Sequence, residues 1–243
     1  MALGSQPRWT VRSADARVGI DVGLRDYMLR VYNYMASGLV LTGIVAYVAA
    51  HSGFYVSIAS TPLIWLVILA PLGLVMLMSF GVERMQASTL QIVFWIYAGL
   101  MGLSLATVFL VFTGTSVARV FFITAGTFAG MSLYGYTTQR DLTGLGSFMT
   151  MGLFGIIIAM LVNGVLALFG AYSTALQFAI CVIGVIVFTG LTAWDTQQIK
   201  EMYYEADDYE TGSKKAIMGA LRLYLDFINL FMMLMQLLGA RRD

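Results

Sequence analysis

Two aspartates lie inside long apolar segments of the C-terminal third of the sequence. Asp195 lies in the run Trp-Asp-Thr-Gln-Gln-Ile-Lys, and Asp226 lies in Leu-Tyr-Leu-Asp-Phe-Ile-Asn-Leu-Phe. An ionisable side chain within a membrane span is costly, so each acid is a candidate functional group. Two carboxylates that share a site of low dielectric cannot both ionise cheaply, and they bind a proton as a pair. Such a pair can sense pH, or it can bind a hard cation such as Ca²⁺ through its oxygens.

Further polar residues flank Asp226 at helical spacing. Arg222, Asn229 and Gln236 fall on one stripe of the same helix, which we expect to face the protein interior and to line the site. Arg222 stands four residues before Asp226 and is a candidate counter-charge, so each acid could instead be neutralised separately. Arg84 is a second candidate cation. It is either a latch that reaches an acid or an anchor at the lipid headgroups.

The elements that must carry these residues are membrane-spanning helices. Of the 243 residues, 59% are hydrophobic and 11% are charged, whereas a soluble domain averages about 25% charged residues. Polar groups could not cover the surface of such a protein in water, but lipid solvates apolar outward faces. The formal net charge of +1 argues against nucleic acid as a partner. The sequence shows no His/Cys cluster, phosphate-binding loop or serine-centred elbow, so we expect neither an enzyme nor a cofactor.

Seven apolar stretches are long enough to cross the bilayer, for which a helix needs about 20 residues. We therefore predict an all-α membrane protein with seven transmembrane helices, over residues 27–50, 62–80, 90–112, 117–138, 147–169, 175–198 and 217–239. Residues 1–26 are expected to form a polar N-terminal arm, and residues 27–240 a single transmembrane domain. Pro71 falls inside the second span and is expected to kink it.

The charges of the connecting segments orient the spans. The N-terminal arm and the loops near residues 81–89, 139–146 and 199–216 carry Lys or Arg, whereas the alternate loops carry neither. The positive-inside rule therefore predicts a cytoplasmic N-terminus. Seven spans would place the C-terminus outside. Arg241 and Arg242 argue against that placement, so a re-entrant or short last segment is an alternative.

The predicted spans place both acids in the cytoplasmic half of consecutive helices. At 1.5 Å of rise per residue, Asp195 lies about 7–8 Å from the inner edge, and Asp226 lies about 13 Å deep. The two depths differ by about one helical turn, which helix tilt can remove. The acids are therefore able to meet.

Small and polar residues predict where helices touch. Gly126 and Gly130 have the spacing of a small-xxx-small contact, and Gly99 with Gly102 and Gly152 with Gly155 are related pairs that indicate close packing. Asn163 in the fifth span is expected to make an interhelical hydrogen bond.

Four stretches of the sequence resemble the Bax inhibitor-1 family, the transmembrane Bax-inhibitor-motif proteins, in its bacterial branch. They are Tyr-Met-Leu-Arg-Val-Tyr-Asn-Tyr-Met-Ala (27–36), Phe-Gly-Val-Glu-Arg-Met (80–85), Trp-Asp-Thr-Gln-Gln-Ile-Lys (194–200) and Leu-Tyr-Leu-Asp-Phe-Ile-Asn-Leu-Phe (223–231). The likeness extends over nearly the whole chain from about residue 20. It implies six helices around a central seventh, and a location in the bacterial inner membrane.

The resemblance also implies an activity, a pH-sensitive calcium leak. In the family, two aspartates form the proton-sensing pair and an arginine on the second span can bridge to them. The match places the pair on Asp195 and Asp226, with Ca²⁺ as the transported ion, and the arginine on Arg84. Some relatives carry an acid midway along the second span, whereas this sequence has none between Thr61 and Val82. Bacterial relatives are also implicated in restraining a membrane-bound ATP-dependent protease.

Three functions therefore compete. The first is a passive calcium leak that protonation of Asp195 and Asp226 closes. The second is a non-conducting regulator of a membrane-bound protease or of a stress or cell-death pathway, which would use the arm and the 199–216 loop for contacts. The third, an intramembrane aspartyl protease, is disfavoured because that class has Tyr-Asp on one helix and Gly-x-Gly-Asp on the next. Here the acids follow Trp194 and Leu225.

Overall fold

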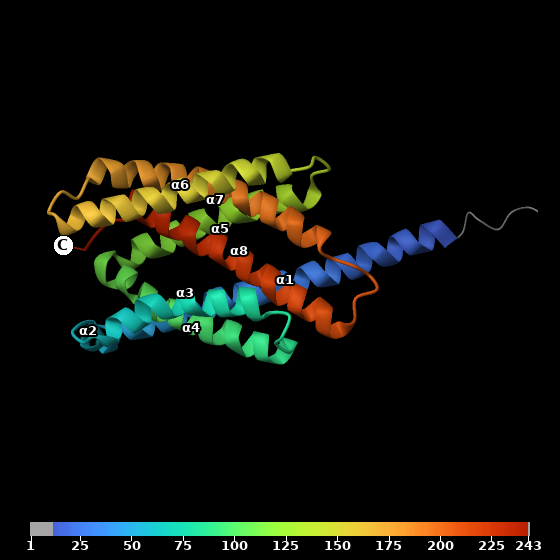
Figure 1. The fold of residues 1–243 in the computed structure, drawn as a ribbon, viewed down its shortest axis with the longest axis horizontal. Coiled ribbons are helices and arrows are strands. Elements are labelled where there is room, and N and C mark those ends of the chain that lie inside the picture. The colour runs from blue at the N-terminus through green and yellow to red at the C-terminus, as the bar shows by residue number, and fades with distance from the viewer. Residues whose placement is uncertain (1–11, 243) are drawn as a thin grey trace, which may run out of the picture.

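Over the residues that the structure describes, the chain folds into eight α-helices, seven of which are long and apolar enough to cross a membrane (Figure 1). The structure, a computed structural model, describes the backbone of residues 12–242 and the side chains of residues 22–242. The helices are α1 (Arg12–His51), α2 (Phe54–Ala59), α3 (Leu63–Gly81), α4 (Ala87–Val111), α5 (Gly114–Thr137), α6 (Thr143–Leu168), α7 (Thr174–Glu201) and α8 (Tyr209–Leu238). The prediction of an all-α protein with seven transmembrane helices is confirmed, and α2 is a short helix in the first loop.

The spans from α3 to α7 begin and end within a few residues of their predicted bounds, but α1 and α8 begin much earlier. Helix α1 starts at Arg12 and runs without a break through the end of the expected arm; the part of the arm before it lies outside the described residues. Helix α8 starts at Tyr209 because the Asp208 carboxylate accepts the backbone N–H of Thr211 at 3.2 Å and caps it. Hydropathy predicts only the part of a helix that lies in lipid, so it does not detect the polar ends of helices such as α1 and α8.

Helix α3 continues through Pro71, which lacks the N–H that would bond the carbonyl four residues before it. That carbonyl belongs to Val67, and the Ser104 hydroxyl of α4 donates to it at 2.7 Å. A carbonyl left bare in the bilayer would cost several kcal/mol. The neighbouring helix therefore supplies the hydrogen bond that proline removes.

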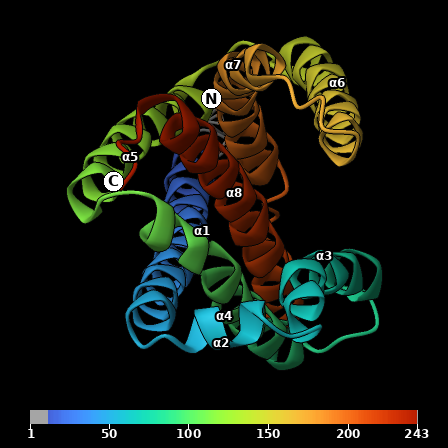
Figure 2. The same cartoon turned by 90° about the vertical axis from the view of Figure 1, so that its left-hand side faces the viewer.

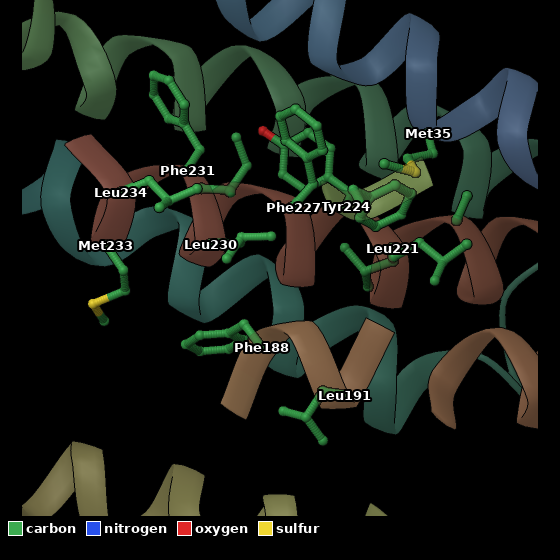
Figure 3. Packing of buried hydrophobic residues seen from close by; sticks show 14 of the residues in the cluster. Met35, Phe188, Leu191, Leu221, Tyr224, Phe227, Leu230, Phe231, Met233 and Leu234 are labelled. Carbon is green, nitrogen blue, oxygen red and sulfur yellow. The ribbon is translucent and has the colours of Figure 1, made fainter. Parts of the chain in front are cut away.

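Helix α8 is the most buried span. In its apolar window of 18 residues, 72% of the residues are buried, against 11–39% in the other six spans. It packs against α1, α4, α5 and α7, while α3 packs on α4 and α6 packs on α7 (Figure 2). Figure 3 shows its apolar side chains directed toward several neighbours, with Met35 of α1 and Phe188 of α7 among them. These contacts put α8 between four spans, and they do not establish the ring of six that the family resemblance implies.

The loops divide between two ends of the bundle. One end, here named the charged end, holds the turns after α3, α5 and α7, and the other, the tail end, holds the turns after α1, α4 and α6 together with the C-terminus (Figure 1). At the tail end Thr113 donates its backbone N–H to the carbonyl of Ala240, and Arg242 donates to the carbonyl of Val111. Helix α8 therefore crosses the whole bundle, and the expected alternative of a re-entrant last segment is wrong. The cytoplasmic placement of the charged end stays a prediction.

The closest helix contacts are not at Gly126 and Gly130, the pair with the small-xxx-small spacing, but at other glycines. Gly126 and Gly130 face open space on α5, so the contact expected there is wrong. A side chain on Gly135 would instead meet the Ala193 carbonyl of α7, and one on Gly102 would meet the Thr42 carbonyl of α1. Sequence spacing shows that two small residues share a helix face, but it does not show whether that face meets protein or lipid.

Candidate functional site

The two aspartates come together between α7 and α8, with Asp195 near the end of α7 and Asp226 near the middle of α8. Asp226 is buried, with 5% of its surface exposed, and 14% of the Asp195 side chain is exposed. The two carboxyl groups lie close enough to interact directly. Oδ2 of Asp226 is buried and has no hydrogen-bond partner among the residues that the structure describes. The structure therefore places the side chains of Asp195 and Asp226 next to each other, as the sequence predicts.

Arg222 completes the charged group. Its Nη1 lies 3.9 Å from Oδ1 of Asp195, so the ion pair crosses from α8 to α7. The expected pairing with Asp226, four residues along the same helix, is not the one that forms. About half of the Arg222 side chain, 48%, is exposed, and a long contact at such a position is a weak one. The arginine therefore offsets part of the charge of the pair, and no ion pair among the described residues involves Asp226.

These three groups hold one negative charge when both acids are ionised and none when a single proton is bound. Burial of a carboxylate without a full set of partners is costly, so a proton or a cation is favoured at the free oxygen of Asp226. Among the residues that the structure describes, no group of three or more His, Cys, Asp or Glu side chains is placed to hold a metal ion. Ca²⁺ takes six to eight oxygens. Two carboxylates can therefore attract a passing cation but cannot form a tight calcium site alone.

Two other residues of the Trp-Asp-Thr-Gln-Gln-Ile-Lys stretch hold the neighbouring turn. The Gln197 side chain accepts the backbone N–H of Leu142 at 2.8 Å and donates to the carbonyl of Arg140 at 2.8 Å. The Lys200 ammonium donates to the carbonyl of Tyr136 in the last turn of α5 at 2.9 Å, where a cation is favoured. This stretch therefore contains one of the two acids together with two residues that fix the connection from α5 to α6. Sequence reasoning missed that second role.

The polar stripe predicted on α8 does not act as one lining. Asn229 donates to the Leu225 carbonyl of its own helix at 2.9 Å. Gln236 lies at the tail end, where its amide oxygen accepts hydrogen bonds from Gln177 and from the Cys181 thiol of α7. The stripe thus separates into the acidic site and a neutral cluster far from it along the helix.

Asn163 belongs to the connection between α6 and α7. Its amide oxygen accepts the backbone N–H of Ser173 at 3.0 Å, and its amide nitrogen donates to the Ser173 carbonyl at 3.2 Å. Its amide nitrogen also donates to Oε1 of Gln177 in α7 at 3.4 Å, so the interhelical hydrogen bond expected for Asn163 is confirmed.

Arg84 is exposed in the turn between α3 and α4. It lines a surface hollow with Gly73, Phe80 and Met85, residues of α3 and the turn. Helix α3 packs on α4, and no ion pair among the described residues involves Arg84. In this structure Arg84 therefore stands apart from both acids, and its role as a latch stays a prediction.

A hydrogen-bond chain beside the acids was not foreseen. The Tyr32 hydroxyl of α1 bonds the Ser132 hydroxyl of α5 at 2.7 Å, and Ser132 bonds the Thr196 hydroxyl of α7 at 3.0 Å. Thr196 directly follows Asp195, so the chain joins three helices next to the site. Only Tyr32 and Thr196 fall in the stretches that resemble the family, and no spacing within the sequence links them to Ser132.

Comparison with known proteins agrees with this architecture. The family model described as "Inhibitor of apoptosis-promoting Bax1" matches residues 24–243. The chain is 51% identical over 235 residues to Uncharacterized protein RP147 of Rickettsia prowazekii (strain Madrid E), covering 96% of this chain and 98% of that protein. It is 45% identical over 233 residues to Inner membrane protein YbhL of Escherichia coli (strain K12), covering 94% of this chain and 97% of that protein. The chain is an integral multi-pass membrane protein that belongs to the Bax inhibitor-1 family.

Proposed function

We propose that the protein is a passive cation leak, with Ca²⁺ as its ion, that protonation of Asp195 and Asp226 closes. The observation that carries this proposal is the buried Oδ2 of Asp226, which has no hydrogen-bond partner beside a second carboxyl group. The likeness to the E. coli inner membrane protein supports the bacterial inner membrane as its location.

The charges give the direction of gating. When the pair binds a proton, the carboxyl groups can share a hydrogen bond and α7 and α8 stay together. When both acids are ionised, they repel across the helix contact, and Arg222 offsets only part of the charge. The repulsion favours separation of the helices and draws a cation to the carboxylate oxygens. Flux should therefore rise as pH rises.

The test is Ca²⁺ entry into liposomes that contain the purified full-length protein, measured across pH. The variant Asp195→Asn with Asp226→Asn keeps the shape of both side chains and removes both charges. We expect it to lose the pH dependence of flux. Gln236→Met, a change of similar size on α8 at the tail end, is the matched control and should keep that dependence.

An unchanged flux and pH profile in the double variant would refute the proposal. A wild-type protein with no flux above empty liposomes would favour the alternative, a non-conducting regulator of a membrane-bound protease or of a stress pathway. Co-purification from native membranes then becomes the deciding measurement, because binding of a protein partner should persist in the variant that lacks both acids.

A further inference from the structure

An apolar groove runs along the outside of the bundle between α1 and α5. Its first half has a volume of about 500 Å³ and is lined by side chains of these two helices, including Met28, Ala36, Phe128 and Ala129. Its second half, of about 260 Å³, continues toward the tail end and has Phe227 and Phe231 of α8 among its lining residues. Leu39 lines both halves, so they adjoin along α1.

The groove exists because α1 and α5 do not pack closely as a pair, although both pack on α8. The Tyr32–Ser132 hydrogen bond joins them inside the groove. Ala36, Ala129 and Leu133 on its walls are exposed, with 62% of Leu133 uncovered. Since both helices cross the membrane, these walls face the acyl chains of the bilayer and not water.

One end of the groove carries positive charge. Arg25 lines it at the charged end of α1, and no ion pair among the described residues involves Arg25. Tyr136 also lines that end, and the Lys200 ammonium lies 5.4 Å from the centre of its ring. The remainder of the lining is almost wholly apolar. A ligand that fits must therefore be amphipathic, with an anionic head and a hydrocarbon chain.

The length of the first half suits one leaflet. From Arg25 to Leu39, α1 rises about 21 Å at 1.5 Å per residue. A bilayer of 40–45 Å gives each leaflet about 20–22 Å including its headgroups. A phospholipid whose phosphate lies beside Arg25 would thus extend its chain to Leu39, where the groove passes into its second half.

We propose that this groove binds one anionic phospholipid from the leaflet at the charged end, with its phosphate beside Arg25 and an acyl chain between α1 and α5. The site lies apart from Asp195 and Asp226 and does not depend on the proposed leak. A bilayer lipid, unlike a protein partner, is always present where this groove opens.

Native mass spectrometry of the full-length protein, stripped of lipid and titrated with phosphatidylglycerol or phosphatidylcholine, tests the proposal. We expect one tightly retained phosphatidylglycerol in the wild type and weaker retention of phosphatidylcholine. Ala36→Trp and Ala129→Trp fill the groove and should lose the retained lipid. Val40→Trp adds the same bulk to an exposed position of α1 outside the groove, and it should keep the lipid.

The headgroup contact has a separate test. A basic residue near an anionic headgroup contributes about 1 kcal/mol, so Arg25→Gln should weaken phosphatidylglycerol about fivefold and leave phosphatidylcholine unchanged. Arg25 is exposed, so this variant carries the test if the tryptophan variants do not fold.

Three results would each overturn the proposal. The first is equal retention of both lipids by the wild type. The second is full retention of phosphatidylglycerol by Ala36→Trp and Ala129→Trp, or, where those do not fold, by Arg25→Gln. The third is a mass of two chains that the tryptophan variants reduce to one, because a second copy of this chain would then occupy the groove.

Discussion

Helix α8 carries two polar clusters that look alike in sequence and differ in structure. Near the middle of α8, Asp226 faces Asp195, and one of its oxygens has no partner among the described residues. At the tail end, the Gln236 amide oxygen accepts hydrogen bonds from Gln177 and Cys181. A neutral cluster whose polar atoms are hydrogen-bonded joins helices with little loss of stability. A buried ionised acid without a full set of partners is unfavourable in free energy, and binding of a proton or a cation reduces that penalty.

This difference shows how polar residues that only hold helices together can be distinguished from polar residues with a function in a membrane span. Both clusters violate the rule that spans are apolar, so their presence alone does not assign a function. What separates them is that Gln236 is exposed and its amide oxygen is paired, whereas Asp226 is buried and one of its oxygens has no partner among the described residues. Neutral clusters should therefore respond to substitution through stability, and the acidic site should respond through pH and ion flux.

The largest expected contrast is in the free energy of unfolding of two variants with substitutions of similar size on α8. Gln236→Met leaves the Gln177 and Cys181 groups without their acceptor and should lower the free energy of unfolding by about 0.5–1.5 kcal/mol. Asp226→Asn removes a buried ionisable group and should leave that free energy unchanged or raise it by about 1 kcal/mol at pH 8. Unfolding of the two full-length variants in the same detergent measures both. A greater loss of unfolding free energy for Asp226→Asn than for Gln236→Met would contradict the proposed difference between the two clusters.

The next effect concerns the cation of the acidic site. Arg222→Gln removes the positive charge 3.9 Å from Asp195, so a higher pH is needed before both acids ionise. We expect the pH midpoint of Ca²⁺ flux in liposomes to move up by less than about one unit, because Arg222 is half-exposed. Arg84→Gln is the matched control, since Arg84 lies apart from the acids. A larger shift for Arg84→Gln would instead support the latch.

A paired polar contact remote from both clusters gives a smaller effect. Ser104→Ala removes the hydrogen bond to the Val67 carbonyl that Pro71 leaves free. We expect a loss of about 1 kcal/mol in unfolding free energy, and no change in the pH profile of flux. Replacing Pro71 by Ala in the same variant should restore stability, because the helix then supplies its own hydrogen bond. Failure of that rescue would show that Ser104 acts otherwise.

The smallest effect is at Asp208, the exposed acid that caps α8. Hydrogen bonds from Thr211, first from its side chain and then from its backbone N–H, lower the pKa of Asp208 below its ordinary 3.8. A depressed pKa in the folded state means that the stabilisation is complete above pH 3.8 and is lost as pH falls through the lower value. Asp208→Asn should remove this acid-dependent loss while keeping a cap. Identical acid unfolding of the variant and the wild type would contradict it.

Much of the fold follows from local sequence. Each span from α3 to α7 is predominantly apolar over 19 to 28 residues. Lipid requires such runs to be helical because a helix satisfies its own backbone. The early starts of α1 and α8 escaped prediction, because polar helical turns such as the one that Asp208 caps have no hydropathy signal. The acidic site was found for the opposite reason, since an acid in an apolar run stands out.

The sequence by itself determined that the protein is a seven-span membrane protein and that Asp195 and Asp226 are its unusual groups, because hydrophobic length and buried charge are properties of the chain. Only the tertiary structure decided that Arg222 pairs across helices with Asp195, and that Gly135 and not Gly126 meets a neighbour. It also decided that α1 and α5 leave a groove between them. The physical reason is that each of these features depends on which helices pack against each other. The sequence of one helix shows which residues share a face, but only packing with its neighbours decides which face is buried.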